Sequence, residues 1–153
     1  WGFSPGDEAM NIAGALYPVM QYYWKPLRSF NVKWSYYPST SLTSGEKHGA
    51  FLDDYDGQTT WLSINVHDFL SKKGKSFWPD YLNVAAGYGV NDYQHLDIRY
   101  ADFYVGLDIN WERIIPGNSN FMLWFKNVLN HFRFLPLPAL RISKKGVSYS
   151  VNF

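Results

Sequence analysis

His67 and Asp68 come closest to acid–base chemistry among the residues of this 153-residue chain. An imidazole and a carboxylate are the side chains that most often move protons in active sites. Both residues end a segment, 58–68, in which apolar and polar residues alternate as in a strand. Adjacent residues of a regular strand point to opposite faces, so we expect polar lining at a rim rather than a direct dyad. His67, Asp68 and His48 are the catalytic candidates that the sequence offers.

No serine or glycine motif adds a second kind of chemistry. Neither Ser63 nor Ser148 lies in the Gly-x-Ser-x-Gly context that marks a nucleophile. The segment "VAAGYGV" contains Gly-x-Gly, but it lacks the third glycine of a nucleotide-binding loop and lies in a predicted strand. We therefore predict no cofactor. The basic turns "SKKGKS" and "SKKG" suit either contact with anionic lipid headgroups or simple solubility.

The segment "HGAFLDDYDG" brings Asp53, Asp54 and Asp56 close together in the sequence. Clustered carboxylates are ligands that calcium and other hard cations prefer. The EF-hand template does not fit, because aligning the acidic residues with it puts Leu52 at the first ligand position and Ser63 at the last. A solvated turn at the Asp-Gly pair is the simpler interpretation, and a metal site at Asp53, Asp54 and Asp56 is the alternative.

Two carboxylates, Asp102 and Asp108, fall in the middle of a predicted strand, on its polar side. Burying a carboxylate without a partner is costly. If the polar side of the strands faces a closed interior, we expect Lys33, Arg99 or Arg141 to pair with these two residues.

Composition limits the classes of partner. With 14 basic and 13 acidic residues the formal net charge is +1, so there is no electrostatic argument for nucleic acid. The absence of cysteine excludes disulfides, thiol chemistry and a lipidated cysteine in this chain. Aromatic residues make up 20% of the sequence. Such a content is typical of aromatic cores and pockets, and also of proteins whose Trp and Tyr lie at the water–lipid boundary.

Alternating patterns predict an antiparallel up-and-down sheet of about six strands, or a small outer-membrane-type β-barrel. The predicted strands are 29–39, 58–68, 81–91, 100–112, 138–143 and 146–153, the last two forming a hairpin. One face of each is apolar, whereas the other holds Gly, Ser, Asn and Asp, which suits a narrow, wet interior better than bulk water. The apolar faces are therefore predicted to meet lipid. The membrane-facing residues are Phe30, Val32, Trp34, Phe103, Val105, Leu107, Trp111, Val147, Tyr149, Val151 and Phe153.

Two helices accompany the strands in a single predicted domain, 1–153. Residues 1–27 form a helical segment in which Pro5 suits the first helical position. Its uncharged stretch is shorter than the roughly 20 residues that span a bilayer. Residues 117–133 form an amphipathic helix that suits either a membrane surface or packing on the sheet. Because the chain opens at Trp1 without a signal peptide, we expect that upstream sequence has been removed.

An outer-membrane barrel has an even number of strands and both ends in the periplasm. On that arrangement both helices lie on the periplasmic side, and residues 38–57 form a long outer loop. The terminal strand with its final Phe153 is similar to the signal for insertion of outer-membrane barrels. About six strands is fewer than the usual minimum of about 8, so missing strands, helices filling the gap or oligomerisation would be needed for closure.

Five blocks of the sequence occur in this order: "WGFSPGDEAMNIAGALY", "VKWSYYPS", "DDYDGQTTWLSINVHDFL", "WPDYLNVAAGYGV" and "LPLPALR". In these blocks and in their order, the chain resembles an uncharacterised bacterial family known as predicted periplasmic lipoproteins. The resemblance covers most of the chain and implies a Gram-negative envelope location, with a helical region upstream. It transfers no catalytic residue, because the family has no established activity. It also implies a lipid anchor, for which this chain contains no cysteine.

These observations lead to three hypotheses. The preferred one is a structural or accessory protein of the bacterial outer membrane, whose partners are the lipid bilayer and other envelope proteins, and no nucleic acid. The second is an enzyme that modifies lipid or lipopolysaccharide, with His48, His67, Asp68 and Asp53 as candidates. The third is a soluble, lipocalin-like binder whose aromatic face turns inward around an apolar ligand.

Overall fold

The computed structural model describes residues 4–45, 51–92, 98–144 and 146–152. Contacts between residues divide the chain into two compact units, a helical unit over Trp1–Phe30 and a sheet-containing unit over Asn31–Phe153. The division lies three residues beyond the end of the helical segment 1–27 that the sequence predicts.

The helical unit contains α1 (Pro5–Tyr23) and a 3-10 helix, η1 (Lys25–Ser29). Pro5 takes the first helical position as predicted, whereas Ser4 caps the helix without a side-chain hydrogen bond. After α1 the chain folds back on the helix, and Gln21 Nε2 donates to the carbonyl of Phe30 at 2.8 Å. No residue of α1 is buried. Among the described helices, none combines the length and the apolar character needed to cross a membrane.

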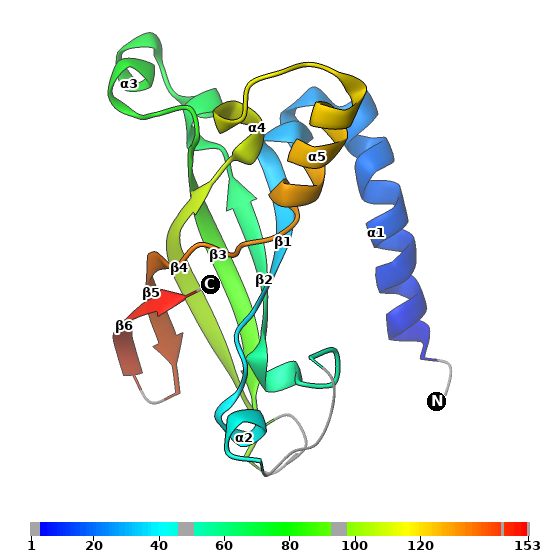
Figure 1. Ribbon diagram of the computed structural model, residues 1–153, viewed down its shortest axis with the longest axis vertical. Helices are drawn as coiled ribbons and strands as arrows, with labels where there is room; N and C mark the ends of the chain where they lie inside the picture. The colour runs from blue at the N-terminus through cyan, green and yellow to red at the C-terminus, as the bar shows by residue number, and fades with distance from the viewer. Residues whose placement is uncertain (1–3, 46–50, 93–97, 145, 153) are drawn as a thin grey trace. The chain divides into compact units, whose positions relative to one another are not determined.

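Six strands form one antiparallel, up-and-down sheet, which confirms the predicted fold class (Figure 1). The strands are β1 (Phe30–Tyr36), β2 (Gln58–Ile64), β3 (Leu82–Asn91), β4 (Tyr100–Ile109), β5 (Leu137–Ser143) and β6 (Gly146–Asn152). They lie side by side in chain order. Within the described residues β1 and β6 are the two edges, so the sheet is open rather than closed into a barrel. The final hairpin joins β5 to β6 as predicted, with Ser143 opposite Gly146.

Three strands end earlier than the alternation predicts, and the first of them, β1, stops at Tyr36 rather than at residue 39. β2 stops at Ile64, and His67 and Asp68 lie in a 3-10 turn, η3 (Val66–Phe69). β4 stops at Ile109, so Trp111 is not a strand residue but the first residue of α4 (Trp111–Ile114). The cause is the side chain of Asn110, which accepts a hydrogen bond from the Glu112 amide at 3.1 Å and so caps a helix where the pattern would continue a strand.

Short helices occupy the remaining connections. The predicted helix 117–133 is α5 (Asn120–Asn130), capped by Ser119, whose Oγ accepts from the Met122 amide at 3.3 Å. The predicted loop 38–57 contains α2 (Thr40–Thr43) and η2 (Tyr55–Gly57), and the turn after β2 contains α3 (Lys72–Phe77). In Figure 1, α3, α4 and α5 lie at one end of the sheet and α2 at the other.

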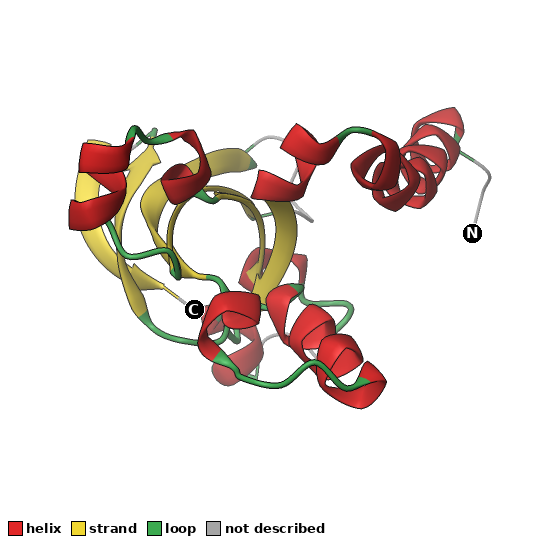
Figure 2. Ribbon diagram, turned by 90° about the horizontal axis from the view of Figure 1, so that it is seen from above, coloured by secondary structure: helices red, strands yellow, loops and turns green. Residues whose placement is uncertain are grey.

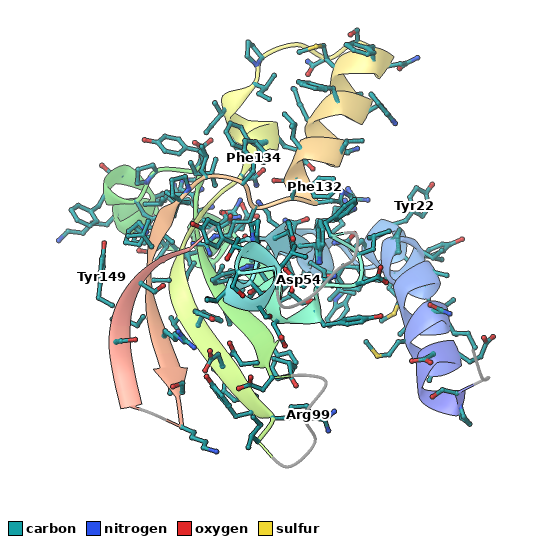
Figure 3. All side chains as sticks on the ribbon, turned by 60° about the horizontal axis from the view of Figure 1, so that its bottom comes forward. Tyr22, Asp54, Arg99, Phe132, Phe134 and Tyr149 are labelled. Carbon is teal, nitrogen blue, oxygen red and sulfur yellow. The ribbon has the colours of Figure 1, made fainter. Side chains whose placement is uncertain are left out.

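The two faces of the sheet have inverted polarity. Seen from above in Figure 2, the strands curve around a common interior. The buried strand residues on the inner face are mostly polar or charged: Lys33, Ser35, Trp61, Ser63, Asn83, Ala85, Asp102, Asp108 and Ala139. On the outer face the apolar side chains are exposed, 46% for Val105 and 69% for Val147. Tyr149 points away from the other strands in Figure 3. The apolar faces therefore form no hydrophobic core within the described residues.

Trp61 is the one large apolar side chain among the buried inner-face residues that the structure describes. Its strand partner is Gly87 of β3. A Cβ atom at Gly87 would lie 2.6–2.9 Å from three atoms of the indole ring, so the ring occupies the space that a side chain would need. The indole Nε1 donates to Ser35 Oγ at 2.8 Å. A tryptophan is therefore accommodated on a polar face because the neighbouring strand has a glycine opposite it.

Substituting Gly87→Ala is expected to destabilise the sheet-containing unit by about 1–3 kcal/mol, the usual cost of overpacking. The measurement is urea unfolding followed by tryptophan fluorescence. Gly89→Ala, on the same strand and face, is the matched control, because its Cβ would lie no closer than 3.3 Å to a neighbour. If the two variants have equal free energies of unfolding, the absence of a side chain at Gly87 is not what accommodates the indole ring.

Candidate functional site

Asp108 is the centre of a charged cluster on the inner face. Its Oδ2 lies 2.7 Å from Lys33 Nζ and accepts from Ser63 Oγ at 2.6 Å. Lys33 Nζ also donates to the carbonyl of Ile109 at 2.6 Å, and Asn83 donates to Ser63 Oγ at 2.8 Å. Lys33 is only 1% exposed. The predicted pairing of Asp108 with Lys33 is confirmed, and it joins three strands through one buried carboxylate.

Arg133 adds a second buried cation that the sequence analysis missed. The segment between α5 and β5 runs beside β1, with Trp34 donating to His131 O at 2.8 Å and Arg133 donating to Trp34 O at 3.0 Å. This backbone contact directs the guanidinium inward, 3.8 Å above the ring centre of Trp61. Its Nε lies 3.9 Å from Asp108 Oδ1. Burial lowers the pKa of Arg133, and the Asp108 carboxylate opposes that shift.

The second inner-face carboxylate, Asp102, has a network of its own. Its Oδ2 accepts from Arg141 Nε at 2.7 Å and from Asn91 Nδ2 at 2.6 Å, with Tyr104 OH at 3.5 Å. Arg141 Nη2 forms an ion pair with the same oxygen. Pairing with Arg141 is thus confirmed, whereas Arg99, the third predicted partner, is exposed. The other oxygen, Oδ1, is buried without a hydrogen bond to any described residue.

A cavity of about 710 Å³ lies beside the Asp102 network. Four separate stretches of the chain line it: 35–44, 56–59, 91–104 and the last hairpin. Most of its lining residues carry hydroxyl groups, and Arg141 is its one cation among the described residues. The volume is within the range of about 300–1,000 Å³ that is typical of ligand sites. This cavity is the candidate binding site of the protein.

The structure does not bring the catalytic candidates together. Asp68 forms an exposed ion pair with Arg113, at 3.2 Å between Oδ1 and Nη2. The His67 ring has no hydrogen bond to a described residue, and neither residue lines the cavity. His48 lies outside the described residues. No pair of acid and base at hydrogen-bonding distance therefore emerges from these candidates.

The three aspartates of the predicted metal site differ in how deeply they are buried. Asp53 is exposed, Asp56 lines the cavity, and Asp54 is 2% exposed. Asp54 Oδ2 accepts from the Ser39 amide at 2.8 Å and from Tyr36 OH at 3.2 Å, so it anchors the chain after β1 (Figure 3). Within the described residues no group of three or more His, Cys, Asp or Glu side chains is placed to hold a metal ion.

The residues predicted to face a membrane have several locations. Val32, Phe103, Val105, Val147, Tyr149 and Val151 are exposed on the outer face, and Phe30, Trp34 and Leu107 are half-buried. Trp34 contacts the ring of Phe132 edge-on at 6.2 Å. Trp111, on α4, stacks on Phe134 with ring centres 5.1 Å apart. Phe153 lies outside the described residues.

Comparisons of the chain with known protein families, with curated proteins and with solved structures found no match. The resemblance to predicted periplasmic lipoproteins therefore remains a prediction from the sequence blocks alone. The site can be interpreted only through its own geometry, which combines a polar interior, an exposed apolar outer face and a hydroxyl-lined cavity.

Proposed function

We propose that the sheet is embedded in the bacterial outer membrane, where it serves a structural or accessory role in an envelope assembly. The observation that carries the proposal is the inverted polarity of the strands. In water, a sheet buries its apolar face and exposes its polar face. Here Lys33, Asp102 and Asp108 are buried, whereas Val105 and Leu140 are about half exposed. Membrane β-sheets have this distribution, with apolar residues toward lipid and polar residues inward.

Strand length supports the same proposal. β3 and β4 each contain 10 residues. A tilted strand needs about 9–11 residues to cross the hydrocarbon layer. The outer face also has a shallow apolar groove of about 290 Å³ that includes Leu62, Tyr88 and Phe103. A lipid acyl chain is an occupant of matching chemistry for such a groove.

Helix α5 has the same inverted polarity as the sheet, with polar residues buried and apolar residues exposed. Its buried residues are Lys126 and Asn130, whereas Phe121 and Trp124 are 66% and 60% exposed. Lys126 Nζ donates to the carbonyl of Gly117 at 2.6 Å, so the charged end is turned away from solvent. A helix with exposed Trp and Phe suits the interface plane of a membrane. We place α5 at the periplasmic surface, at the end of the sheet that also has α3 and α4.

The two alternative functions have less support. A lipid-modifying enzyme would need an acid and a base near each other, and the described candidates His67 and Asp68 do not form such a pair. A lipocalin-like binder would turn the apolar strand face inward around its ligand. Most described residues of that face are exposed, and the cavity on the other side has a largely polar lining.

Cysteine substitutions at two neighbouring alanines provide a test of the proposal. The chain has no cysteine, so Ala85→Cys and Ala86→Cys each introduce a single labelling site. Ala85 is fully buried on the inner face, and Ala86 is exposed on the outer face. With a fluorescent thiol label on protein in phospholipid vesicles, we expect spin-labelled lipid tails to quench the label at residue 86 strongly. Quenching at residue 85 is expected to be weak.

The pair Ala139→Cys and Leu140→Cys on β5 provides an independent repeat, because Ala139 is buried and Leu140 is exposed. Equal quenching at both members of each pair, or none, would count against contact between the outer face and lipid. Location is tested separately by density fractionation of envelopes from a Gram-negative host. Recovery of the protein in a detergent-free soluble fraction would exclude the outer-membrane proposal.

A further inference from the structure

The cavity beside Asp102 has a lining suited to a particular class of ligand. Serine, threonine and tyrosine are the majority of its lining residues, from Ser35 on β1 and Thr59 on β2 to Tyr104 on β4. Each hydroxyl group can both donate and accept a hydrogen bond. A ligand that fits this lining must therefore carry several neighbouring groups that, like the lining hydroxyls, can both donate and accept hydrogen bonds.

The charged residues of the lining favour a neutral ligand over an anion. Arg141, the one cation among the described lining residues, is held on the buried carboxylate of Asp102 through Nε and Nη2. The lining also contains two acidic residues, Asp56 and Asp92. A phosphate or carboxylate ligand would meet a neutralised cation and two carboxylates. A neutral ligand is therefore favoured on electrostatic grounds.

The polar groups of the cavity are also fixed in advance. Asn91 donates to Asp102 through Nδ2, and Arg141 contacts the same carboxylate through Nε and Nη2, so both side chains are held in place. The buried Oδ1 of Asp102 has no partner among the described residues, so the network is one donor short. Side chains held in place by such contacts lose little freedom when a ligand binds.

From these observations we infer that the cavity binds a neutral saccharide. A sugar presents hydroxyl groups in several directions, which match the hydroxyl-rich lining. Its rings also have apolar C–H faces, for which Tyr100 and Tyr104 offer aromatic surfaces. The inference concerns the inner face only and does not depend on what covers the outer face.

The test measures binding of two free trisaccharides, maltotriose and the trimer of N-acetylglucosamine, by titration calorimetry. The protein is kept in a zwitterionic detergent without a sugar headgroup, so that the detergent does not compete. We expect saturable binding of at least one trisaccharide. Thr59→Val, which removes one lining hydroxyl, is expected to weaken it by about two- to tenfold, the effect of one hydrogen bond.

Thr60→Val is the matched control, because Thr60 is the next residue of β2 and is exposed on the outer face. It should leave the affinity unchanged. A second arm uses vesicles containing digalactosyl diacylglycerol: binding there alone, weakened by Thr59→Val, identifies a glycolipid headgroup as the source of the sugar. Absence of saturable binding in both arms, equal losses in the two variants, or displacement of the sugar by inorganic phosphate would each overturn the inference.

Discussion

Replacing Asp108 by alanine is expected to lower the free energy of unfolding by about 3–5 kcal/mol, because it leaves buried charge without a partner. Lys33 lies 2.7 Å from the Asp108 carboxylate and Arg133 lies 3.9 Å from it. Both cations are almost completely buried. Ser63 also loses its hydrogen-bond acceptor. Urea unfolding of the protein refolded in detergent micelles, followed by circular dichroism, measures the loss.

Two further variants show whether the buried charge is the cause. In Lys33→Met with Asp108→Leu both members of the closer pair become apolar, and the part of the loss that comes from an unpaired Lys33 should return, since such replacements are often neutral or stabilising, whereas Arg133 still lacks its carboxylate. Asp68→Ala breaks the exposed pair with Arg113 and should cost less than about 1 kcal/mol. A loss in Asp68→Ala as large as that in Asp108→Ala would show that burial does not determine the energy of these pairs.

The alternation of residues predicted the strands and their two faces because the side-chain period of a strand is set by its backbone. Asp102 and Asp108 could be assigned to a polar face by counting from Val105. The need for buried partners pointed to Lys33, Arg99 and Arg141, of which Lys33 and Arg141 form the expected pairs. These predictions depend only on local geometry and on the cost of burying charge.

Other features depend on contacts that the alternation of apolar and polar residues does not encode. Arg133 lies in an irregular segment, and its direction is set by the backbone contact with Trp34. The burial of Trp61 depends on a register that places Gly87 opposite it. Trp111 was assigned to a strand because the pattern continues there, but the cap at Asn110 ends β4 first. The cavity joins four distant stretches, so no single motif could have indicated it.

The inverted polarity leads to a second large effect, in which the sign of the stability change identifies the medium around the outer face. Val105 lies in the middle of β4 and is 46% exposed. If lipid covers it, Val105→Lys should destabilise the protein in phospholipid vesicles by about 2–4 kcal/mol, as lysine does at the midplane of membrane strands. If water covers it, the same substitution should change stability by no more than about 0.5 kcal/mol. Urea unfolding in vesicles measures the difference.

Ile98→Lys separates the effect of depth from that of added charge. Ile98 is exposed to a similar degree but precedes β4, so its lysine would lie near the end of the strand. The cost of a lysine falls to about 0–1 kcal/mol near the interfaces of a membrane. A large loss of unfolding free energy in Val105→Lys together with a small loss in Ile98→Lys requires a medium whose polarity changes along the strand. Water cannot produce that gradient, so equal and small losses at both positions would remove the physical basis for an embedded sheet.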